Sequence, residues 1–112
     1  IGAGIHAAAI ENAAGNFELP NLKNIEEAAS VVKTVRPNSG VSIVDPSAKA
    51  TKAYPISTFT YAIVPGNAPQ AAAVKAFINY AITKGQAYGA ALDFAPLPSV
   101  VLSAAQKALG SL

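Results

Sequence analysis

Between Tyr54 and Pro65 the chain reads Tyr-Pro-Ile-Ser-Thr-Phe-Thr-Tyr-Ala-Ile-Val-Pro, and this run sets the expectation for the fold. Pro55 fixes its own φ angle and favours an extended conformation for Tyr54, so the run begins with a stiff turn. From residue 58 to 64, large aromatic or β-branched side chains alternate with smaller ones, which is the period of two that a strand shows. The sequence therefore predicts a buried strand over 58–64, which Pro65-Gly-Asn67 ends.

The composition describes a short, weakly charged chain. It has 112 residues, of which 52% are hydrophobic and 12% charged, about half of the ~25% charged share of average globular domains. This length allows one domain at most. The seven lysines and Arg36 are scattered, so no basic patch indicates a nucleic-acid partner. The chain has no Cys, which excludes disulfides, and no apolar run reaches the ~18 residues of a membrane span.

A helix is predicted from Asn24 to about Lys33. Asn24 is the expected N-cap, and Glu27 three residues later is the second member of a capping box. The apolar residues that follow have the spacing of one helical face; they are Ile25, Ala28, Ala29 and Val32.

The last third of the chain is predicted to be helical. One helix begins near Pro69 and ends near Gly85, because proline suits a first helical turn and glycine suits the residue after a helix. Residues 86–92 are expected to add one or two helical turns. A final helix is predicted from Ser99, as N-cap, to Gly110.

Three short strands are expected, and they lie far apart in the sequence. Besides 58–64 they are Ile5–Ile10 and Val41–Val44. Together with three helices they predict a small α/β unit. A parallel sheet needs neighbouring strands and two covered faces, so we expect part of the sheet to lie outside this chain. The chain also has no Met and no signal-peptide pattern at its start, and we expect it to be a fragment of a longer protein.

The only histidine, His6, is the one residue that could serve a Ser-His-Asp triad, with Asp45 or Asp93 as its partner. No Gly-x-Ser-x-Gly elbow accompanies it, and a single histidine in an apolar strand more often packs or donates a hydrogen bond. The segment Arg36-Pro-Asn-Ser-Gly40 has groups that suit an anion, but it equally fits a surface loop. No spacing of His, Cys, Asp or Glu indicates a metal site.

Five stretches in order along nearly the whole chain resemble one family. They are Ala9-Ile-Glu-Asn-Ala-Ala-Gly-Asn-Phe17 with Pro20, the acidic helix Asn24–Ala29, Tyr54-Pro-Ile-Ser-Thr-Phe-Thr-Tyr61, Val74-Lys-Ala-Phe-Ile-Asn-Tyr-Ala81 with Gly85-Gln86, and Leu92-Asp-Phe-Ala-Pro-Leu-Pro98. Each motif alone is weak, whereas the order and spacing of all five are specific. The chain resembles the C-terminal third of the periplasmic phosphate-binding protein, the substrate receptor of the bacterial phosphate ABC transporter.

The resemblance implies a two-lobed type II periplasmic-binding-protein fold, α/β, with each sheet flanked by helices and incomplete in this chain. Residues 1–53 would end the second lobe, and residues 54–112 would supply a hinge strand and the C-terminal helices of the first lobe. It implies a protein that is not an enzyme and has no cofactor. The implied partners are inorganic phosphate, the membrane subunits of an ABC permease and the remainder of the same polypeptide. The implied location is periplasmic or extracellular, including attachment to the cell surface by a lipid anchor.

The family's phosphate ligands are not expected in this chain. They are helix N-terminal amides, Ser or Thr hydroxyls, an Asp and an Arg beside a Ser-Gly-Thr motif, all from the N-terminal and middle parts of the full protein. Arg36-Pro-Asn-Ser-Gly40 lacks the Asp and Thr of that motif, so no ligand-binding, catalytic or metal residue is predicted. A same-fold receptor for sulfate, molybdate or tungstate stays open, as do a small secreted hydrolase relying on His6 and a structural or adhesion module.

Overall fold

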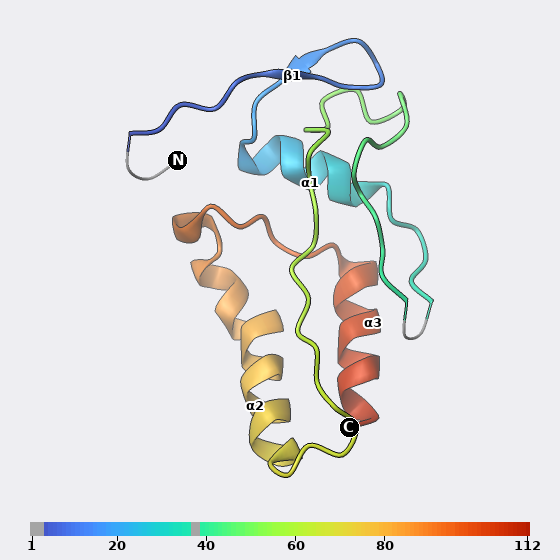
Figure 1. Ribbon diagram of the computed structural model, residues 1–112, viewed down its shortest axis with the longest axis vertical. Helices are drawn as coiled ribbons and strands as arrows, with labels where there is room; N and C mark the ends of the chain where they lie inside the picture. Colours follow the sequence, from blue (N-terminus) through green and yellow to red (C-terminus); the bar gives the residue numbers. More distant parts are fainter. Residues whose placement is uncertain (1–3, 37–38) are drawn as a thin grey trace.

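The computed structural model describes residues 4–36 and 39–112 (Figure 1). In this part of the chain, a two-stranded antiparallel sheet and three α-helices form a small mixed α/β structure. The elements in chain order are β1 (Ile10–Glu11), β2 (Phe17–Glu18), α1 (Leu22–Ser30), α2 (Ala71–Ile82), the 3₁₀ helices η1 (Lys84–Tyr88) and η2 (Ala90–Leu92), and α3 (Ser99–Gly110).

The two strands form a hairpin with Ile10 opposite Glu18 and Glu11 opposite Phe17. The turn between them contains Gly15 at φ +82°, a backbone conformation that glycine adopts without steric cost. The prediction of a strand over Ile5–Ile10 was therefore wrong for all but its last residue. Residues 5–9 find no partner strand, whereas Ile10 pairs because the turn brings residues 17–18 back beside it.

Helix α1 begins earlier than predicted. Its N-cap is Asn21, whose side-chain oxygen accepts a 2.9 Å hydrogen bond from the N–H of Asn24. The predicted N-cap, Asn24, is wrong because this residue lies inside the helix and its amide group is directed inward. Of the predicted apolar face, Ala28 and Ala29 are buried and Ile25 is half-buried. The predicted end near Lys33 was wrong, because α1 ends at Ser30 and the buried Val32 follows the helix.

The core is small and consists of two clusters around α1. One contains Ala28, Ala50 and Ala53. In the other, Ala29, Val32 and Ile43 are buried. Half-buried side chains from the same two stretches and from two other segments, 58–64 and α3, pack against them; these are Val31, Val35, Val41, Phe59, Val100 and Val101. Ile43 is the one large side chain of the described residues that is fully buried, at 2% exposure. The core therefore joins α1, the 41–53 segment and the start of α3.

The C-terminal helices confirm the pattern expected for the last third of the chain. Helices α2 and α3 run antiparallel and contact one another (Figure 1). The expected extra turns over 86–92 are present as η1 and η2. The prediction that Ser99 is the N-cap of α3 was wrong: Pro98 holds that position, because its extended backbone, at ψ 146°, directly precedes the helix. The prediction that Gly85 follows the end of the helix was wrong: α2 ends at Ile82, and Gly85 lies inside η1 as its second residue.

The two other predicted strands, 41–44 and 58–64, lie in no sheet. Segment 58–64 is drawn in Figure 1 as a long extended trace without an arrow. It was predicted to be buried, and this was wrong, because Ile63 is 94% exposed and Tyr61 is 53% exposed. Strand pattern alone does not form a strand, since a ladder needs a second extended segment beside it.

The molecule exposes more surface than its size predicts. It has 7766 Å² of accessible surface, whereas a compact monomer of 11.3 kDa exposes about 5,700 Å². Its radius of gyration is 15.6 Å, against about 13 Å for a compact domain of this length. Among the described residues, no helix has the length and apolar character needed to cross a membrane.

Candidate functional site

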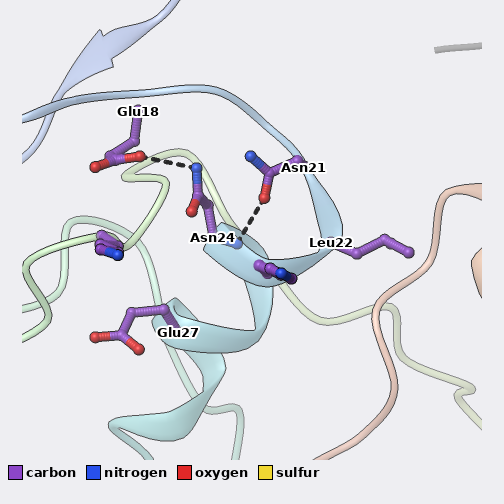
Figure 2. Close-up of a pocket in the computed structure, with 7 residues that line it drawn as sticks. Glu18, Asn21, Leu22, Asn24 and Glu27 are labelled. Atoms are coloured by element: carbon purple, nitrogen blue, oxygen red, sulfur yellow. Dashed lines mark hydrogen bonds between the residues drawn. The ribbon is translucent and has the colours of Figure 1, made fainter.

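A hollow of about 700 Å³, lined mostly by polar residues, lies at the N-terminal end of α1. The residues around it come from β2, the first turns of α1 and the segment before Tyr54; they are Glu18, Asn21, Leu22, Lys23, Asn24, Glu27 and Lys52. Figure 2 shows the side chains of Glu18 and Asn21 directed toward Asn24. We call this hollow the α1 hollow.

The centre of the α1 hollow is a set of satisfied hydrogen bonds. The buried amide of Asn24 donates to the Glu18 carboxylate and to the Leu19 carbonyl, each at 2.9 Å. The backbone N–H of Asn24 donates to Asn21. Each of these donors already has a protein partner. The Asn24 amide, which could otherwise contact a ligand, therefore fixes the path of the chain into α1.

The charges around the α1 hollow do not favour one class of ligand. Two carboxylates, Glu18 and Glu27, and two ammonium groups, Lys23 and Lys52, surround it. A site built for an oxyanion would combine free N–H donors with an excess of positive charge. The four charges balance, so the α1 hollow carries no assignment as an anion site.

A second hollow, of about 550 Å³, brings together two of the residues considered for a triad. His6 and Asp93 both line it, beside the apolar side chains of Ile5, Leu19 and Leu22. Asp93 sits there because its backbone adopts the left-handed conformation, φ +59°, that ends η2. The sequence singled out both residues, and the fold places them around one hollow although they are far apart in the chain.

This second hollow lacks the remaining parts of a nucleophilic site. No Ser or Thr is among its lining residues. Within residues 4–36 and 39–112, no hydrogen bond joins His6 to Asp93, and both side chains are exposed. The other candidate acid, Asp45, lies elsewhere, where its N–H donates to the Pro55 carbonyl at 2.8 Å. The nucleophile and the base–acid contact that a triad needs are therefore not assembled here.

The Arg36 segment lies partly outside the described residues, since Pro37 and Asn38 are not described. Of the rest, Arg36, Ser39 and Gly40 are exposed, and the Ser39 N–H donates to the Arg36 carbonyl at 3.4 Å. No group of three or more His, Cys, Asp or Glu side chains within 4–36 and 39–112 is placed to hold a metal ion.

Asn12, one of the residues in the motifs quoted above, makes hydrogen bonds that join two segments of the fold. Asn12, which is 6% exposed, donates to the carbonyls of Thr51 at 2.9 Å and Ala53 at 3.1 Å. Its side-chain oxygen accepts from the N–H groups of Ala14 and Asn16. One side chain thereby shapes the hairpin turn and fastens it to the 51–53 segment. The only sign of this role in the sequence is an asparagine three residues before Gly15, a composition typical of turns.

Two other motif residues have the same kind of role. The buried Ser57 hydroxyl donates to the Tyr54 carbonyl at 2.8 Å and closes the turn before segment 58–64. The Gln86 side chain donates to the Ala81 carbonyl at 3.1 Å and accepts from the Leu97 N–H at 3.0 Å. Gln86 therefore links the end of α2 to the proline-rich connector before α3.

No protein-family model matches this chain, and no curated protein sequence matches it significantly.

Proposed function

We propose that this chain is the C-terminal part of a receptor that binds inorganic phosphate and delivers it to an ABC-type permease. The observation that carries the proposal is the ordered set of five motifs over nearly the whole sequence. In that proposal the receptor has the two-lobed type II fold, and residues 54–112 return from the second lobe to the first. The receptor closes about a hinge on the dehydrated anion and then docks on the permease.

The hydrogen bonds of the motif residues support a structural role for this chain within the receptor. Asn12, Ser57 and Gln86 all direct their polar groups to backbone atoms of the chain itself. Side chains engaged in this way are not free to bind an anion. The phosphate ligands are then residues of the receptor outside these 112, and the chain contributes shape and mechanical continuity between the lobes.

The surface of the chain supports the same proposal. Twelve large apolar side chains are exposed within residues 4–36 and 39–112, among them Ile63 of segment 58–64 at 94%. Burial of apolar area stabilises a protein by roughly 25 cal/mol per Å², and this area contributes nothing while it stays exposed. A longer polypeptide that packs against these side chains would supply that stabilisation. The proposed location is the periplasm or the cell exterior, with a lipid anchor at the cell surface as one form of attachment.

Calorimetric titration tests the ligand. The full receptor that contains this sequence is titrated with phosphate, and heat of binding at micromolar phosphate is expected. The 112-residue chain titrated in the same way is the control and is expected to give no heat. A receptor that ignores phosphate and binds sulfate, molybdate or tungstate in competition would refute the phosphate assignment while preserving a same-fold oxyanion receptor.

We also propose that the chain is not an enzyme and needs no cofactor. The competing hydrolase needs His6, and the hollow around His6 and Asp93 is lined by no hydroxyl nucleophile. If purified chain shows esterase or peptidase activity, His6→Ala abolishes it under the hydrolase hypothesis. Activity that disappears in His6→Ala and persists in a matched surface variant, Lys84→Ala, would overturn our proposal.

A further inference from the structure

Two stretches of the chain, 41–45 and 55–61, run in opposite directions and are joined only at their ends (Figure 1). At one end the Asp45 N–H donates to the Pro55 carbonyl at 2.8 Å, the one backbone–backbone bond between the two stretches. Proline has no N–H, so it cannot return a second bond. At the other end the Tyr61 hydroxyl bonds to both the N–H and the carbonyl of Val41.

Between these two ends lie buried backbone groups without a hydrogen-bond partner. Ile43 is 2% exposed and Ser57 is 3% exposed. Within residues 4–36 and 39–112, the backbone N–H and C=O groups of these two residues make no hydrogen bond. More than ~90% of buried backbone polar groups in native proteins are hydrogen-bonded, because an unpaired one costs free energy. Closing the space between the two stretches would therefore be favourable.

The register that would pair these groups follows from the existing bonds. In an extended chain, backbone groups two residues apart point to the same side. Val41 and Asp45 both bond to the second stretch, so Ile43 between them faces it as well. Counted from the bond at Asp45 in steps of two, the antiparallel register places Ile43 opposite Ser57 and Val41 opposite Phe59. Burial agrees with this register, because in 41–44 and 55–60 every odd-numbered residue is buried or half-buried and every even-numbered one is exposed.

Two side-chain hydroxyls hold the stretches in the arrangement that the structure describes. The chain bends at 55–56, and the Ser57 hydroxyl fixes this bend by donating to the Tyr54 carbonyl at 2.8 Å. Beyond the bend, the Tyr61 hydroxyl takes both backbone groups of Val41 that a paired strand would use.

We infer that residues 41–43 and 57–59 form a latch, an antiparallel ladder that is open in this structure and closes when the Phe59 backbone replaces the Tyr61 hydroxyl at Val41. Each hydrogen-bonded pair of an antiparallel ladder exchanges two bonds. Closing therefore replaces the two bonds of Tyr61 with two pairs of backbone bonds, and it gives partners to the buried groups of Ile43 and Ser57.

The latch controls how firmly segment 58–64 is attached to the core. In the open form this segment is held by the packing of Phe59 on the core and by the Tyr61 hydroxyl. In the closed form the backbone of its first residues is fixed to the segment that carries Ile43. All of these contacts lie within the 112 residues, so the inference does not rest on the proposed function.

Disulfide capture tests the latch and its register, because the chain has no Cys of its own. The register places the exposed Ser42 and Thr58 opposite one another, with Cα atoms about 4.5 Å apart when the latch is closed, a separation that a disulfide can bridge. With oxidised glutathione and dilute chain, Ser42→Cys/Thr58→Cys is expected to form its internal disulfide several-fold faster than the out-of-register control Ser42→Cys/Thr60→Cys. Mass spectrometry follows the disulfide, and far-UV circular dichroism verifies that each variant keeps its helices. A pair in register that reacts no faster than the control overturns the inference.

Adding Tyr61→Phe to the Ser42→Cys/Thr58→Cys chain tests the exchange at Val41. The bonds of the Tyr61 hydroxyl exist only in the open form, so their removal shifts the equilibrium toward the closed form, and disulfide formation is expected to become several-fold faster. Tyr88→Phe in the same chain is the control and is expected to leave the rate unchanged. If the hydroxyl merely ties the two stretches together, Tyr61→Phe leaves the rate unchanged or lowers it, and either result overturns the inference.

Discussion

The hydroxyl of Tyr61 forms two hydrogen bonds with the backbone of Val41: it donates to the carbonyl oxygen at 2.9 Å and accepts from the N–H at 2.8 Å. A side chain thus occupies both backbone groups that a neighbouring strand would use at Val41. This contact ties segment 58–64 to the segment that carries Ile43, the most deeply buried large side chain among the described residues.

Tyr61→Phe removes both bonds and keeps the ring. We expect the free energy of unfolding to fall by about 1 kcal/mol. A typical hydrogen bond contributes ~0.5–1.5 kcal/mol net, and the two bonds of the Tyr61 hydroxyl are at an exposed site, where water replaces part of their contribution. Urea unfolding at a concentration where the chain is monomeric measures the change. Tyr88→Phe is the control, since the Tyr88 ring is more exposed. Equal effects of the two substitutions would contradict the role assigned to the Tyr61 hydroxyl.

Asn12→Ala should be among the most destabilising polar substitutions in the chain. It removes the donor to the carbonyls of Thr51 and Ala53 and the acceptor for two turn N–H groups, and it leaves buried groups without partners. We expect a loss of about 2–3 kcal/mol, since an unsatisfied buried group costs ~1–3 kcal/mol. Denaturant titration measures it.

The matched control for Asn12 is Asn16→Ala, which removes one exposed bond to the same Thr51 carbonyl. Its expected cost is under about 1 kcal/mol. An Asn16→Ala variant that loses as much stability as Asn12→Ala would show that burial does not distinguish the two asparagines.

Asn21→Ala tests which asparagine begins α1. Removing the cap that accepts from the Asn24 N–H should lower stability by about 1 kcal/mol, whereas Asn21→Ser should keep most of it, because serine also caps well. Far-UV circular dichroism during thermal unfolding follows the helix. A serine variant as unstable as the alanine variant would argue against capping by this side chain.

Ile43→Ala tests the core between α1 and the 41–53 segment. Truncating a fully buried aliphatic side chain usually costs about 2–5 kcal/mol, because it leaves a cavity. The neighbouring Val44 is 57% exposed, so Val44→Ala should change stability by about 0.5 kcal/mol or less. Similar losses for the two neighbours would contradict the placement of Ile43 in the core.

The helices were predictable because their signals are local. The apolar residues of α1 repeat every three to four residues, and that repeat is present in the sequence whatever else the chain does. The start of α1 was harder to predict because Asn21 and Asn24 both suit an N-cap. The choice between them depends on the carboxylate of Glu18 and the carbonyl of Leu19, which draw the Asn24 side chain inward.

The strands and the polar sites were not predictable in the same way. A period of two at 58–64 indicates an extended backbone, but pairing depends on a second segment, and none of the described residues supplies it. Asn12 binds carbonyls 39 and 41 residues away, and His6 meets Asp93 around one hollow only after the chain has folded. Residues so far apart in the chain come together only in the assembled fold, and no repeating pattern in the sequence predicts such a contact.

The bonds of Asn12 have a consequence for limited proteolysis. A single backbone cut after the exposed Lys33, as an engineered site for a specific protease would give, separates the hairpin and α1 covalently from the rest of the chain. The hydrogen bonds of Asn12 to Thr51 and Ala53, the bond from the Tyr54 N–H to the Asn24 carbonyl and the packing of Ala29 on Ile43 all bridge that cut. A nicked chain should therefore migrate as one species in a native gel and separate into two fragments only when it is denatured.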